Sequence, residues 1–138
     1  MFPTSRSGFL RTLLGVPIAL AATAAAPLSA GRRTEHPDPR PGIDASGVLS
    51  GEELAGFGPD VAAVYDLVRE MPHIADGIGC SCGCSYMPSY RSLLTCFHAG
   101  GMAMGCHICQ GTARLAHRRW NEGQPLERIR AALDARYG

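Results

Sequence analysis

The stretch "GCSCGCS", residues 79–85, places Cys80, Cys82 and Cys84 at alternate positions, with Gly83 between the last two. Residues two apart in an extended chain point the same way, so the three thiols are predicted to face one point. Gly83 allows the backbone to curl around that point, because a residue without Cβ adopts positive φ freely. We expect an irregular loop here, organised around its own sulfur atoms.

Three further cysteines, Cys96, Cys106 and Cys109, complete a C-x-C-G-C, C, C-x-x-C pattern. Cys106 and Cys109 are three positions apart at the predicted start of a helix, so they share a face. The positive end of that helix favours thiolates. Two convergent thiol sets on short, constrained segments can supply four sulfurs to one metal ion. The six cysteines are therefore the candidate metal ligands.

The rest of residues 49–138 is predicted to be helical. Apolar residues recur at helical spacing over 60–71, and Pro72 ends that pattern. Similar patterns cover 106–122 and a last helix that starts after Pro125. No segment alternates for long enough to be a strand. We expect a mainly α, small single-domain protein with an irregular cysteine-rich metal-binding loop.

The N-terminal part is predicted to direct export. In residues 1–30, Arg6 and Arg11 precede an uncharged Leu- and Ala-rich run with small residues after it, as in a Sec or Tat-like signal peptide. Residues 31–48 are rich in Pro, Gly and charge and are predicted to form a flexible tether. We expect an extracytoplasmic protein, which is periplasmic, secreted, or held at the membrane only through an uncleaved signal segment.

Composition narrows the classes of function. The 138 residues carry 13 basic and 12 acidic side chains, a net charge of +1, which leaves no basic footprint for nucleic acid. No carboxylate pair, Ser–His–Asp set or phosphate-binding loop points to catalysis. Binding or delivery of metal, with a metal-donor or metal-acceptor protein as partner, is preferred over enzymatic activity.

Two metals suit such thiols. Zn(II) takes four sulfurs in a closed site, whereas Cu(I) accepts two or three and forms clusters. Six thiolates around one divalent ion would leave a large negative charge that several Cu(I) ions would share better, so Cu(I) stands slightly ahead of Zn(II). The adjacent His98, Met102, Met104 and His107 are weaker candidate ligands. The methionines alternatively fill the core.

Two other interpretations remain open. An even number of cysteines outside the cytoplasm is typical of a disulfide-stapled domain, although rings closed by Cys80–Cys82 or Cys106–Cys109 would stabilise little. The "CHIC" segment, residues 106–109, is also typical of a thiol–disulfide oxidoreductase. Those enzymes use a βαβ framework, and no strand is predicted before Cys106.

Four segments, "VYDLVREMPHIADGIGCSCGC", "LLTCF", "GCHIC" and "TARLAHRRWNEGQPLERIRAALDARYG", resemble the bacterial PCYCGC-motif proteins. The resemblance covers residues 64–138, and all six cysteines fall on family positions. Gly79 stands where the motif has Pro, Ser81 where it has Tyr, and Tyr90 in the place of a family His. The lipid-attachment Cys of many members is missing. The resemblance implies an exported, cysteine-rich, metal-binding domain and does not name the metal.

Overall fold

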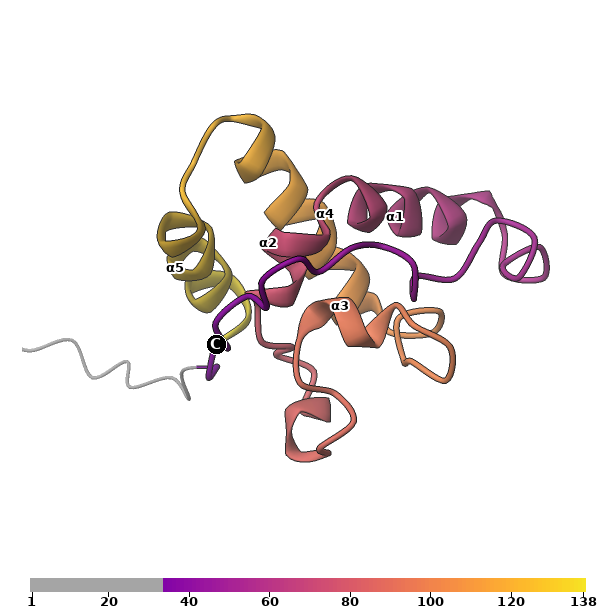
Figure 1. Ribbon diagram of the computed structural model, residues 1–138, viewed down its shortest axis with the longest axis horizontal. Coiled ribbons are helices and arrows are strands. Elements are labelled where there is room, and N and C mark those ends of the chain that lie inside the picture. Colours follow the sequence, from indigo (N-terminus) through magenta and orange to yellow (C-terminus); the bar gives the residue numbers. More distant parts are fainter. Residues whose placement is uncertain (1–33) are drawn as a thin grey trace, which may run out of the picture.

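The computed structural model describes residues 34–138, which form one helical body (Figure 1). Its elements are α1 (Pro59–Glu70), α2 (Pro72–Asp76), the short 3-10 helix η1 (Cys84–Tyr86), α3 (Leu93–Cys96), α4 (His107–Asn121) and α5 (Leu126–Tyr137). The predicted mainly α fold is confirmed, because the only β pairing in this part of the chain is an isolated bridge between Val48 and His98. The predicted signal peptide lies outside the described residues. Within 34–138, no helix has both the length and the apolar character needed to cross a membrane.

Helix α1 forms where the apolar spacing predicts it. Gly58 adopts φ 88°, which separates the preceding turn from the helix, and Pro59 takes the first helical position, where a missing N–H costs nothing. Val64, Tyr65 and Val68 lie on one face and are fully buried. Pro72 ends α1 and also starts α2, a short helix that the sequence pattern does not predict.

Helix α4 lies between α1 and α5 (Figure 1). Ala113 and Ala116, which are fully buried, keep its inner face small enough for close packing. Gly111 lies against the hydroxyl end of Tyr137 on α5, where a Cβ would collide with that hydroxyl. These small residues set how deeply the start of α4 sits in the molecule, and the start of α4 carries two cysteines.

Residues 34–48, which were predicted to be part of a flexible tether, are instead packed against the helical body. This segment lies along the helical body, and its backbone and side chains bond to distant residues (Figure 1). Arg40 donates from its backbone N–H and its guanidinium to Asp76, whose side chain is fully buried at the end of α2. Arg91 and Ser92 donate to the same carboxylate. Polar and charged composition led to the tether prediction, but here those polar groups bind a buried carboxylate.

The network around Asp76 makes a prediction about stability. Burial alone would raise the pKa of Asp76, but hydrogen bonds from Arg40 and Ser92 outweigh it and lower the pKa to about 2. Its stabilising contribution is therefore complete above roughly pH 4 and is lost as the pH falls through about 2. Asp76→Asn should lower the free energy of unfolding at neutral pH by about 1–3 kcal/mol, and should flatten its decline below pH 4.

The matched control is Asp66→Asn, because Asp66 is 70% exposed and pairs only with Arg69 on the same helix. Its effect should stay within about 0.5 kcal/mol. Chemical denaturation from pH 2 to 7 measures both variants. Equal losses in the two variants would contradict the role assigned to the buried carboxylate.

Candidate metal centre

Three segments bring the six cysteines together. Cys80, Cys82 and Cys84 lie on the loop after α2, and Cys96 is the last residue of α3. Cys106 is the N-cap of α4, and Cys109 lies in its first turn. Gly83 has φ 86° and ψ −3°, the left-handed conformation predicted for it, and turns the loop back toward α4. The predicted convergence of the two thiol sets is present.

The sulfur atoms are close but unbonded. Cys80 Sγ lies 3.0 Å from Cys82 Sγ and 3.3 Å from Cys109 Sγ. Cys82 Sγ lies 3.0 Å from Cys84 Sγ and 3.6 Å from Cys109 Sγ. A disulfide bond is about 2.05 Å long, and all six cysteines are free. The cluster thus consists of free thiols and not of disulfide bonds.

Five of the six thiols form two overlapping groups of three, which meet where Cys80, Cys82 and Cys109 lie within 3.6 Å of one another. Cys80, Cys96 and Cys109 have sulfur atoms within 4.8 Å of one another, and so do Cys82, Cys106 and Cys109. Cys109 belongs to both groups. Within residues 34–138, no four Cys, His, Asp or Glu ligand atoms meet the same criterion. Three-sulfur coordination therefore fits this arrangement more closely than a four-sulfur site does.

Hydrogen bonds among the thiols decide where the protons lie. Contacts from Cys109 and Cys96 lower the pKa of Cys80, so that this thiol ionises first. Contacts with Cys80 and Cys96 raise the pKa of Cys109, which keeps its proton. Burial and the neighbouring thiols raise the pKa of Cys82. A cation that binds all these sulfurs must displace several protons, as thiolate ligation generally requires.

The start of α4 also favours negative charge. The Cys109 backbone N–H donates to Cys106 Sγ over 3.4 Å, so Cys106 caps the helix with sulfur in place of the usual oxygen. The positive end of the 15-residue helix points at the same sulfurs. These features stabilise thiolates next to a cation.

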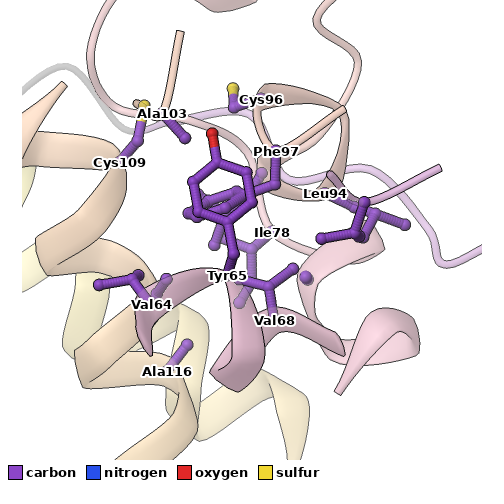
Figure 2. Packing of buried hydrophobic residues seen from close by; sticks show 14 of the residues in the cluster. Val64, Tyr65, Val68, Ile78, Leu94, Cys96, Phe97, Ala103, Cys109 and Ala116 are labelled. Atoms are coloured by element: carbon purple, nitrogen blue, oxygen red, sulfur yellow. The ribbon is translucent and has the colours of Figure 1, made fainter. Parts of the chain in front are cut away.

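Tyr65 connects the hydrophobic core to the thiol cluster. Its ring packs edge-on against Phe97 with 4.7 Å between the centroids, and its hydroxyl points toward Cys96 and Cys109 (Figure 2). The side chain is fully buried, and no described atom accepts or donates a hydrogen bond at the hydroxyl. Burial, together with the two nearby thiols, raises the pKa of Tyr65 to about 12. The phenol therefore keeps its proton and remains a hydrogen-bond donor.

The N-terminal segment holds the cysteine loop, a role the sequence does not predict. Gly79 N–H donates to His36 Nδ1 over 3.0 Å, and His36 Nε2 lies 3.1 Å from Asp134 on α5. Thr34 Oγ1 lies 3.0 Å from Ser81 Oγ. Proline at position 79, as in the PCYCGC motif, could not make the bond to His36, because proline has no N–H.

A surface cavity of about 680 Å³ lies between this segment and the loop. Its lining includes Thr34, His36, Cys80, Cys82, Tyr86 and Arg91. Solvent and small solutes can therefore approach the cluster on the side of Cys82, which is only partly buried.

The structure places the weaker candidate ligands as follows. The ring of His98 packs against Gly47, and burial with the nearby Arg40 lowers its pKa. Neither His98 nor the exposed His107 belongs to a group of three. Met102 is 49% exposed, while Met104 packs against the core as its alternative interpretation predicts.

Comparisons with known proteins found no relative, so the site is interpreted from its geometry alone. No protein-family model, no curated protein and no solved structure matches this chain.

The close packing of Gly79 against Thr34 and Glu35 leads to a testable prediction. A Cβ there would collide with the Glu35 backbone carbonyl and with Thr34, so Gly79→Ala must push the N-terminal segment off the loop. We expect the free energy of unfolding to fall by about 1–3 kcal/mol. Gly105→Ala is the control, because Gly105 lies beside Cys106 and has no atom within 4 Å of the added Cβ. Thermal melting of both variants measures the difference, and equal stability would contradict the described packing.

Proposed function

We propose that this chain binds a soft metal ion through its cysteine thiolates, with Cu(I) preferred over Zn(II), and handles that metal outside the cytoplasm. The observation that carries the proposal is the convergence of five free thiols from three segments into two groups of three that share Cys109. Cu(I) accepts two or three sulfurs, whereas structural Zn(II) sites are almost always tetrahedral.

The distances support direct coordination. Three atoms that lie no more than 4.8 Å apart share a point at most about 2.8 Å from each, close to a metal–sulfur bond of about 2.3 Å. Small side-chain rotations therefore suffice to close either group around an ion. Four thiolates at tetrahedral positions would require a larger rearrangement of the loop or of α3.

The other two interpretations fit this geometry less well. A stapled domain needs sulfur pairs at bonding distance, and the shortest distance between the described sulfurs is 3.0 Å. An oxidoreductase of the predicted kind needs a strand before its C-x-x-C, but a loop precedes Cys106 among the described residues. The cysteines of "CHIC" instead join the same cluster as the C-x-C-G-C loop.

Export and the resemblance to the PCYCGC-motif proteins complete the proposal. Outside the cytoplasm, free thiols are prone to oxidation, and a bound cation protects them. Delivery requires a second protein that gives or takes the ion, so a metal-donor or metal-acceptor partner is part of the proposed function.

The test is metal analysis of the full chain, purified without a metal-binding tag and titrated under anaerobic conditions. Cu(I) should bind and should not be displaced by excess Zn(II), and denatured samples should show six free thiols without reductant. Cys109→Ser should remove most of the bound copper, since this residue belongs to both groups. Protein with no metal and no free thiols would support the stapled alternative, and stable binding of Zn(II) alone would overturn the choice of copper.

A further inference from the structure

We propose that the cluster holds two Cu(I) ions, one in a closed inner site and one in an open outer site, with the Cys109 thiolate bridging them. The inner site consists of Cys80, Cys96 and Cys109, and the outer site of Cys82, Cys106 and Cys109. This inference rests on the proposed function and adds the number of ions and the order in which they leave.

The shared sulfur is the first support. Each group of three is compact enough to surround an ion. Cys80 and Cys82, which belong to different groups, lie 3.0 Å apart, but the two groups have only Cys109 in common. One ion therefore cannot satisfy both, and a thiolate has enough lone pairs to bind two soft cations at once. The sixth thiol, Cys84, lies 3.0 Å from Cys82 and belongs to neither group.

Burial divides the two sites. The inner residues Cys80, Cys96 and Cys109 are at most 1% exposed, whereas Cys82 and Cys106 are partly exposed. Both Cys80 and Cys82 line the surface cavity, but Cys80 is only 1% exposed, and Cys106 precedes the exposed His107. A chelator or an acceptor protein can reach an ion at the outer site from solvent. The inner ion is less accessible, because its three ligands are at most 1% exposed.

Tyr65 supports the inner site independently. Its fully buried hydroxyl has no described hydrogen-bond partner and points toward Cys96 and Cys109, which are both inner ligands (Figure 2). A buried hydroxyl without a partner is unfavourable, and a thiolate held by a metal is an acceptor that this donor can use. Tyr65 is thus a positioning residue for the inner site, and it acts once that site is filled.

The charge of the filled cluster is moderate. Two Cu(I) ions with five thiolates carry a net charge of about −3, which the bridge spreads over both metals. The positive end of α4 and the Cys109 N–H face this charge from one side, and the Tyr65 hydroxyl faces it from the core.

The experiment follows copper removal from the full chain after anaerobic loading with Cu(I). The wild-type protein should hold two ions per chain and release them to an excess of a coloured Cu(I) chelator in two phases of equal amplitude. The slow phase should be at least about tenfold slower than the fast phase. Cys106→Ser should lose the fast phase alone, and Cys96→Ser the slow phase alone. Cys84→Ser removes the thiol that belongs to neither group and should keep both phases, and loss of either phase would overturn this assignment of ligands.

Tyr65→Phe provides a variant that keeps every thiol. The slow phase should accelerate by roughly three- to tenfold while the fast phase is unchanged. Without metal, the variant should melt at or above the wild-type temperature, because it removes a hydroxyl that has no partner. Tyr90→Phe is the control, since the Tyr90 hydroxyl donates to the Gly100 carbonyl and not to a thiol. An unchanged slow phase in Tyr65→Phe would overturn the positioning role.

The outcomes separate the two proposals. Absence of copper from the loaded wild-type protein overturns the proposed function itself. One ion per chain, or a single release phase, overturns only the two-site inference. If Cys96→Ser does not reach the wild-type helix content by circular dichroism, the wild-type stoichiometry and the Cys106→Ser kinetics still decide between one site and two.

Discussion

The arrangement of this protein depends on the position of one sulfur, that of Cys109. Cys109, Ala113 and Ala116 recur at helical spacing on the buried face of α4, so the packing that buries the two alanines also fixes the cysteine. Cys109 then contacts Cys80 and Cys82 from the loop and shares a group with Cys96 and with Cys106. The packing of α4 in the core therefore also determines the geometry of the thiol cluster.

This coupling explains how a small domain can carry so many thiols in its interior. Protonated cysteine packs as a small apolar residue, so the cluster can form part of the core before any cation is present. Cys96 and Cys109 join Tyr65 and Phe97 in the buried cluster (Figure 2), and Cys80 belongs to the same cluster. In the proposed metal-bound form, a cation replaces the thiol protons, the same atoms become ligands, and the binding adds to the free energy of folding.

Much of the fold and the clustering of the cysteines could be predicted from the sequence. Long helices with clear apolar spacing, such as α1 and α4, follow from local pattern alone, and so does the left-handed turn at Gly83. The short α2 and α3 could not be predicted in this way. A helix of four or five residues has no stability of its own, and tertiary contacts determine it.

Contacts between polar residues far apart in the chain also could not be predicted from the sequence. His36 reaches Gly79 and Arg40 reaches Asp76 across separations of 43 and 36 residues, and nothing local marks those pairs. A segment rich in Pro, Gly and charge was therefore interpreted as a tether, although residues 34–48 contact the cysteine loop and α2. His98 was a candidate ligand because of its proximity in sequence, but its ring packs against Gly47.

X-ray absorption spectroscopy of the anaerobically copper-loaded full chain tests the central claim most directly, because it reports the atoms bound to the metal. We expect a coordination shell of sulfur alone, with about three sulfurs per copper and a second copper nearby. A coordination shell dominated by nitrogen or oxygen would contradict the claim, since the metal would then be bound somewhere other than among the thiols that meet at Cys109.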